Sequence, residues 1–270
     1  MQRQMTASAT SVGSDRRRVS FCSMPFDMVD QRDVLGMLDS RTLDHSFEYV
    51  TTPNVDHVVR TRRDEAALLP LYEDAWMTVC DSRVLAALSS LAGSRLPVTT
   101  GADLTAILFR HAIAPSDRIN VVGSDPEVIR RLKAQCHLSQ ITQFVPPMRL
   151  NEQPHEILKC VEFIEQHPAR FTFLAVGSPQ QEKIAHGVWS RGRAKGTGLC
   201  IGTSLEFTTG VVPRAPGWVQ GMRLEWLHRL AQEPGRLSRR YLVDDMAIFS
   251  IFLRHVVARL ASRGQQMRTR

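Results

Sequence analysis

The chain has 270 residues, 43% of them apolar and 23% charged, a balance typical of a globular protein with room for one large domain, or one domain and an appendage. No run reaches the ~18 consecutive apolar residues that a membrane-spanning helix needs. The first residues are polar and lead into three arginines, a pattern unlike that of a secretory signal peptide, and we expect residues 1–18 to form a disordered lead.

The five cysteines are widely spaced, and none forms a Cys-x-x-Cys pair. An odd number without paired spacing argues against a disulfide framework and against a zinc site, so a reducing cytoplasm is the consistent compartment. The nine histidines are scattered as well, and no cluster of His, Cys and Asp has the spacing of metal ligands. The sequence therefore predicts no metal.

The charge is unevenly distributed along the chain. Residues 211–270 contain 11 Arg, no Lys and 4 acidic residues, whereas the first 210 residues contain 23 basic and 23 acidic residues. The whole net charge of +7 thus belongs to the tail. Such a tail suggests a separate role at a membrane surface, a phosphate group or a nucleic acid.

Apolar runs rich in β-branched and aromatic residues alternate with segments of helical spacing. The predicted strands are residues 47–52, 76–80, 118–123, 141–145, 171–176 and 198–202. The predicted helices begin at residue 55 and span residues 84–91, 104–111, 126–136, 154–166 and 183–191. This alternation is typical of an α/β fold with a Rossmann-like, mostly parallel sheet covered by helices. We assign residues 19–210 to this domain and residues 211–270 to a basic helical appendage.

The stretch Gly177–Glu182 follows a predicted strand and leads into a helix. In parallel α/β sheets, ligands bind beyond the carboxyl ends of the strands, where such turns lie. Gly177 lets the backbone approach a ligand, while Gln181 and Glu182 are expected at the helix N-terminus, where free N–H groups favour an anion. The alternative is a plain strand-to-helix turn with polar surface residues.

Polar residues follow two other strands. Thr52 and Asn54 stand where a hydroxyl and an amide can meet a ligand, although Asn54 also suits the N-cap of the next helix. Asp81 directly follows the second strand and fits either a general base or an N-cap. Arg83 is placed to hold that carboxylate ionised or to reach a phosphate.

Further candidates carry clear structural alternatives. Thr100 and Asp103 have the spacing of a capping box, and Gly101 between them leaves room for a diphosphate. Gly123, at the end of a strand, is another binding candidate. The glycine fingerprint of dinucleotide-binding folds is missing, which argues against a nucleotide-dependent oxidoreductase.

From residue 214 the pattern becomes that of a helical tail. One stripe has apolar residues four apart, at Trp218, Met222, Trp226 and Leu230. A second stretch carries Arg236 and Arg239, and a third, residues 246–260, is largely apolar. These helices can pack on the domain, or form an appendage on an anionic membrane face, or do both. The apolar stripe and the absence of a nucleic-acid motif argue against binding to nucleic acid.

In this order, these pieces resemble the WecG/TagA/CpsF glycosyltransferases, which form glycosyltransferase family 26. The resemblance covers roughly residues 19–245. It rests on the following motifs: Thr52-Pro53-Asn54; Asp81 at a strand end; Thr100-Gly101-x-Asp103-Leu104; Gly177-x-Pro179-x-Gln181-Glu182; Gly202 with Glu206-Phe207 and Gly210; Arg214-Ala215-Pro216-x-Trp218; Leu224-Glu225-Trp226-x-x-Arg229-Leu230; and Glu233-Pro234-x-Arg236-Leu237-x-Arg239-Arg240-Tyr241.

The resemblance implies a bacterial enzyme of the cytoplasm, peripheral on the inner face of the plasma membrane. Members transfer a sugar from a UDP-sugar to a polyprenyl-diphosphate-linked saccharide, inverting the anomeric centre, and no metal or other cofactor is expected. The products feed teichoic acid, enterobacterial common antigen or exopolysaccharide assembly. The C-terminal appendage closes over the site. The resemblance leaves open whether the chain forms a homo-oligomer.

Site residues carry over by matching position. Asp81 would be the general base that takes the proton of the acceptor hydroxyl. The residues that would line the pocket are Thr52, Asn54 and Gln181. The residues that would neutralise the diphosphate of the leaving UDP or of the lipid are Arg229, Arg236 and Arg239.

Three positions depart from the family pattern. Ser82 stands where glycine usually follows the aspartate, Val98 stands in the segment where arginine is common, and Glu206 stands where aspartate is usual. Arg83 or Arg95 is a candidate to replace the missing arginine. The departures suggest a sub-branch with a different donor or acceptor. They also support the alternative of a catalytically decayed, membrane-docked subunit of a polysaccharide assembly complex.

Overall fold

The structure, a computed structural model, describes residues 16–148, 150, 153–213, 215–216, 219, 227, 230–231, 234–239 and 243–268, without the side chains of residues 234, 236, 237 and 262–268. At its centre is a six-stranded sheet in which every pair of neighbours is parallel. The strand order is β4-β3-β8-β7-β5-β6. The strands are β3 (Glu48–Thr51), β4 (Met77–Thr78), β5 (Arg118–Gly123), β6 (Gln140–Phe144), β7 (Phe171–Ala175) and β8 (Thr197–Cys200). The predicted α/β fold class is confirmed.

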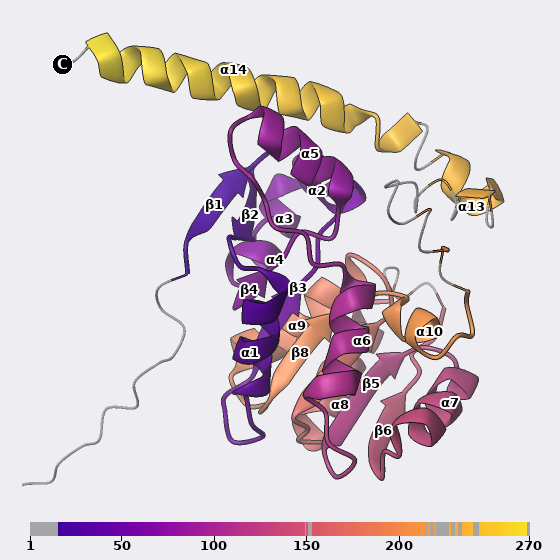
Figure 1. Cartoon of the computed structure of the whole chain (residues 1–270). Coiled ribbons are helices and arrows are strands. Elements are labelled where there is room, and N and C mark those ends of the chain that lie inside the picture. Colours follow the sequence, from indigo (N-terminus) through magenta and orange to yellow (C-terminus); the bar gives the residue numbers. More distant parts are fainter. Residues whose placement is uncertain are drawn as a thin grey trace, which may run out of the picture.

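Helices cover both faces of this sheet (Figure 1). One face packs against α1 (Gln31–Asp39), α6 (Gly101–His111) and α7 (Pro126–Cys136). The other face packs against α8 (Pro154–Gln166) and α9 (Gln180–Arg191). Successive side chains of a strand point to opposite faces, so that Val121 joins the first layer and Val122 the second. Burial on both sides explains why these strands are nearly continuous apolar runs.

A third apolar cluster lies beside β4. It is formed by the hairpin β1 (Arg18–Phe21) and β2 (Met24–Asp27) with α2 (Val55–Arg63), α3 (Glu65–Leu68), α4 (Pro70–Glu73), α5 (Arg83–Leu91) and α14 (Ala247–Arg268). Two shorter helices complete the described elements, α10 (Ser204–Thr208) and α13 (Pro234–Arg239). In Figure 1, α14 lies across this end of the molecule, over α2 and α5.

The hairpin β1–β2 was not predicted from the sequence. The Arg18 guanidinium forms an ion pair with Asp27 at 2.9 Å, and the Asp27 carboxylate accepts the backbone N–H of Thr78 at 2.8 Å. Asp27 thereby links the hairpin to β4, the strand that precedes Asp81. Arg18, which the sequence placed in the disordered lead, is in fact the first residue of β1.

Candidate active site

The polar residues singled out in the sequence meet at one edge of the sheet. They follow the carboxyl ends of β4, β3, β8 and β7, four strands that are neighbours in the sheet. Hydrogen bonds connect these ends directly: the Asp81 N–H donates to the Pro53 carbonyl at 3.0 Å, and the Thr52 hydroxyl donates to the Cys200 carbonyl at 2.9 Å. The edge therefore brings the carboxylate of the second predicted strand close to the Thr52–Asn54 segment.

Asp81 is not the N-cap of α5. That position is held by Ser82, whose Oγ accepts the N–H of Leu85 at 3.2 Å. The half-buried side chain of Asp81 is thereby excluded from the capping role that the sequence left open. Ser82 is also the residue that departs from the glycine usual in the family. Its role here is to cap α5, for which serine is among the best residues.

Arg83 turns towards the segment where the family arginine is missing. It lines a cavity of about 140 Å³ together with Ala86, Ala87, Ser90 and Val98. The Arg83 Nε is buried and has no hydrogen-bond partner among the residues that the structure describes. Arg95 is exposed. Because Arg83 lines the same cavity as Val98 and Arg95 is exposed, Arg83 is the better candidate to replace the arginine that is missing near Val98.

The cap at the start of α6 is confirmed. Thr100 Oγ1 accepts the N–H of Asp103 at 3.0 Å and donates to Asp103 Oδ2 at 2.7 Å. A Cβ on Gly101 would lie 3.0 Å from Ser204 Oγ and 3.3 Å from Thr52 Oγ1. Gly101 therefore lets α6 pack closely on α10 and on the end of β3, and its contact with a diphosphate stays a prediction.

Gly123 is also a packing position. Its φ is +90°, and a Cβ there would lie 2.8 Å from the Ala175 carbonyl oxygen and 2.7 Å from Val176 Cγ1. By contrast, Gly177 has a φ of +78° and open space where a Cβ would be. Of these two glycines, only Gly177 leaves its backbone accessible to a ligand.

The Gly123 packing predicts a measurable loss of stability. Gly123→Ala is expected to lower the free energy of unfolding by about 1–2 kcal/mol through left-handed strain and by about 1–3 kcal/mol more through overpacking. Gly93→Ala is the matched control, because Gly93 has a similar φ of +75° with open space around it. Urea denaturation measures both, and equal losses would contradict the packing role.

The departure at Glu206 lies at the same sheet edge, on α10. The Ser124 hydroxyl, just after β5, donates to Glu206 Oε1 at 3.0 Å. Burial raises the pKa of Glu206 above its usual value. This carboxyl therefore links α10 to the end of β5.

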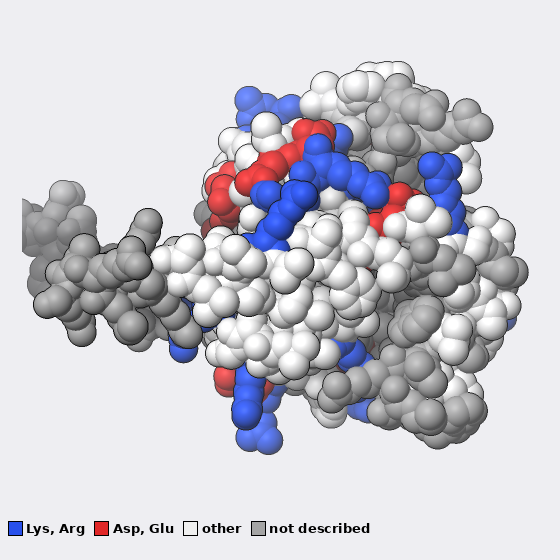
Figure 2. Space-filling view, turned by 90° about the horizontal axis from the view of Figure 1, so that it is seen from above, with Lys and Arg blue, Asp and Glu red and all other residues white. Residues whose placement is uncertain are grey.

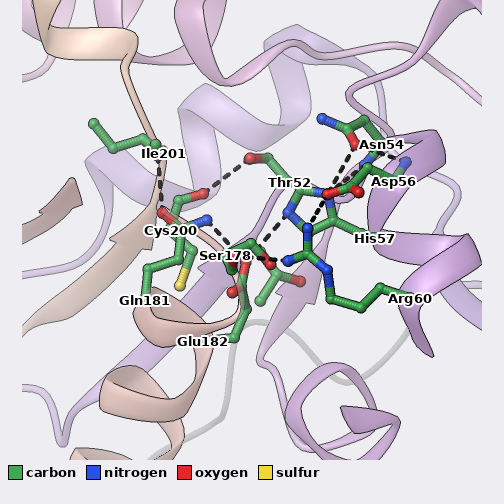
Figure 3. A network of polar contacts seen from close by, with 12 residues as sticks. Thr52, Asn54, Asp56, His57, Arg60, Ser178, Gln181, Glu182, Cys200 and Ile201 are labelled. Atoms are coloured by element: carbon green, nitrogen blue, oxygen red, sulfur yellow. Dashed lines mark hydrogen bonds and ion pairs between the residues drawn. The ribbon is translucent and has the colours of Figure 1, made fainter. Parts of the chain in front are cut away.

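Beneath the Gly177 turn, side chains from α2 and α9 form a polar network (Figure 3). Gln181 is 3% exposed, and its Oε1 accepts the Gly202 N–H at 2.9 Å. Its Nε2 donates to Glu182 Oε1 at 2.8 Å, and the same carboxylate oxygen lies 3.5 Å from His57 Nε2. The Arg60 guanidinium donates to the Ser178 carbonyl at 2.6 Å and holds the turn from α2.

The placement of Glu182 corrects one sequence-based expectation. We expected Glu182 to project from the helix N-terminus towards an anion, but its side chain is fully buried. It faces His57, a residue that the sequence analysis did not select. The signal was its position three residues after Asn54, because Asn54 caps α2 and His57 completes the capping box.

The arginines expected from the appendage are only partly described. Arg229 lies outside the described residues, as does the side chain of Arg236. Arg239 is exposed on α13. In the part of the chain that the structure covers, no three His, Cys, Asp or Glu side chains gather as a metal site would require.

Helix α14 has two apolar faces. One packs on the third cluster, where Ile248 is buried and the ring of Phe252 lies 6.2 Å from that of Phe21. Arg259 fixes this face by donating to the Ala92 carbonyl at 2.9 Å and to Ser94 Oγ at 2.8 Å. The opposite face exposes Phe249, Leu253, Val257 and Leu260, and together with Met246, just before the helix, these residues form what we call the outer stripe.

The outer stripe forms part of the surface seen in Figure 2. Uncharged side chains run along α14 in that view, with both basic and acidic groups beside them. No helix among the described residues combines the length and apolarity that crossing a membrane would take. The packing of α14 on the domain, one of the two roles considered for the tail, is confirmed.

A comparison with protein families agrees with this architecture. The model of the Glycosyl transferase WecG/TagA/CpsF family matches residues 19–262, which is most of the chain and includes the sheet, the polar edge and much of α14. The chain therefore belongs to the WecG/TagA/CpsF family of glycosyltransferases, which transfer a sugar from a donor to an acceptor in the synthesis of cell-surface polysaccharides.

Proposed function

We propose that the chain transfers a sugar from a UDP-sugar to a polyprenyl-diphosphate-linked saccharide and inverts the anomeric centre, with Asp81 as the general base. The observation that carries this proposal is the position of Asp81. Its backbone is bonded to Pro53 at the edge shared with Asn54 and the Gly177 turn, and Ser82 performs the capping in its place.

The chemistry needs one carboxylate on the acceptor side. Asp81 takes the proton of the acceptor hydroxyl while that oxygen attacks the anomeric carbon. The bond from this carbon to the UDP oxygen breaks, and its electron pair leaves on the diphosphate. Arginines then neutralise the charge that builds up on the leaving group, for which Arg83 and the appendage residues Arg229, Arg236 and Arg239 are the candidates.

The lipid part of the acceptor places the reaction at a membrane surface. The outer stripe of α14 is a continuous apolar face next to a tail with 11 Arg, and such a face suits the boundary between headgroups and acyl chains. If the outer stripe contacts the membrane, the opposite face of α14 can stay packed on the third apolar cluster of the domain. We propose that this surface is the cytoplasmic face of the plasma membrane.

A donor screen tests the proposed function. The purified chain is mixed with vesicles that contain a polyprenyl-diphosphate saccharide, and UDP release from each of several UDP-sugars is measured. The proposal predicts release with one donor, dependent on the acceptor. Tight UDP binding without turnover on any acceptor would instead favour the decayed subunit.

A further inference from the structure

The carboxylate of Glu182 is the most deeply buried charged group near the candidate site. Burial by itself would raise the pKa of Glu182, but the neighbouring His57 ring and the hydrogen bond from the Gln181 amide hold it below its usual value. An ionised carboxylate is costly to bury, and a glutamine of the same shape would cost less. The charge at this position therefore calls for a specific role.

One arm of the network runs from Glu182 to Asn54. The His57 Nε2 faces this carboxylate at 3.5 Å, and because a carboxylate only accepts, the contact is favourable when Nε2 carries the proton of the ring. In that tautomer Nδ1 is an acceptor, and it takes the Asn54 N–H at 3.3 Å, as in the capping box. Asn54 Oδ1 accepts the Asp56 N–H at 3.1 Å, which sets the amide so that its nitrogen points away from the first turn of α2 (Figure 3).

The other arm runs from Glu182 to Gly202. The Gln181 amide stands between a group that only accepts, the Glu182 carboxylate, and a group that only donates, the Gly202 N–H. Its orientation is therefore determined, with Nε2 towards Glu182 and Oε1 towards Gly202. Through this amide, Glu182 holds the turn after β8 against the first turn of α9.

We propose that Glu182 is a positioning residue, whose carboxylate orients Asn54 through His57 and the Gly202 turn through Gln181. The two arms end after β3 and β8, two strands that are neighbours in the sheet and whose carboxyl ends belong to the candidate site. The proposal rests on the proposed function for its kinetic consequence, but the side-chain geometry that it requires is independent of activity.

The kinetic test is Glu182→Gln, which keeps the shape and removes the charge. Misplacing polar groups that orient a substrate slows the chemical step, so we expect kcat to fall about 10–100-fold, with little change in the KM for the donor. Glu165→Gln is the matched control. Glu165 lies on α8 and forms an ion pair with Arg191, which is in the last turn of α9, at the opposite end of that helix from Glu182. The control is expected to retain full kcat.

A double variant separates positioning from general damage to the fold. If Glu182 acts through Asn54, the loss in Glu182→Gln with Asn54→Ala is smaller than the product of the two single losses. Losses that multiply would overturn the link to Asn54. A kcat for Glu182→Gln equal to that of the wild type would overturn the positioning role itself.

The ¹⁵N chemical shifts of the His57 ring in the wild-type protein test the geometry without any activity. The proposal predicts a protonated Nε2, with altered His57 shifts in Glu182→Gln but not in Glu165→Gln. A ring that is protonated at Nδ1 alone would overturn the proposal, even if the chain proves to transfer sugar. If no donor is turned over but Nε2 is protonated as expected, the proposed function fails and the network remains.

Discussion

Replacing Asp81 by Asn is expected to lower the rate of sugar transfer about 10²–10⁴-fold, the usual contribution of a general base. An asparagine keeps the shape of the side chain but cannot take the proton of the acceptor hydroxyl. Affinity for UDP should change little, because the base acts on the acceptor. Transfer rates under saturating substrates and calorimetric titration with UDP measure the two effects separately.

Asp125→Asn is the matched control for this substitution. Asp125 follows β5 at the same edge of the sheet, and its carboxylate caps α7 by accepting the Glu127 N–H at 2.7 Å. Asparagine is an equally good cap, so neither stability nor rate should fall. Full transfer activity in Asp81→Asn would remove Asp81 from the mechanism, and an equal loss in both variants would show a general effect of charge at this edge.

Placing a charge on the outer stripe of α14 is expected to release the protein from anionic vesicles. From Met246 to Leu260 the stripe covers 15 residues, which is about 22 Å at 1.5 Å per residue, and Leu253 at its middle is 63% exposed. Leu253→Glu removes an apolar contact worth about 1.5–3 kcal/mol and introduces repulsion from the lipid headgroups. Co-sedimentation with vesicles should therefore weaken by at least about tenfold.

Ala258→Glu provides the control, since it adds the same charge at an exposed position outside the stripe of the same helix. Binding of this variant should remain close to that of the wild type. Raised salt is expected to weaken the binding of all variants, because it screens the attraction of exposed arginines such as Arg239 and Arg254 for anionic headgroups beyond about 8–10 Å. Equal vesicle binding by Leu253→Glu and the wild type would rule out the stripe as the docking face.

The sheet could be predicted from the sequence because its strands are buried on both faces. Runs such as Phe171–Ala175 are apolar throughout, and turn signals separate them from helices with clear periodicity. The location of the candidate site could be predicted as well, because parallel strands place their carboxyl ends at one edge of the sheet, where ligands bind. The strand-end positions of Asp81, Asn54 and Gln181 therefore predict that they lie at one edge of the sheet.

What the sequence could not show depends on contacts between distant segments. The hairpin β1–β2 has strands of only four residues, and it is held by the bond from Asp27 to Thr78 rather than by a pattern of its own. Glu182 looked like a surface residue of a helix N-terminus, because only the packing of α2 against α9 brings His57 over it. The sequence also could not show whether Asp81 caps α5. In the structure Ser82 is the N-cap instead, and its hydroxyl accepts the Leu85 N–H.

The central claim is an inverting transfer assisted by a single base, and the anomeric configuration of the product tests it most directly. Purified wild-type protein is supplied with an α-linked UDP-sugar and a polyprenyl-diphosphate acceptor, and the one-bond ¹³C–¹H coupling of the new anomeric centre is measured by NMR. We expect a β linkage. An α linkage would mean retention, and it would contradict the role assigned to Asp81.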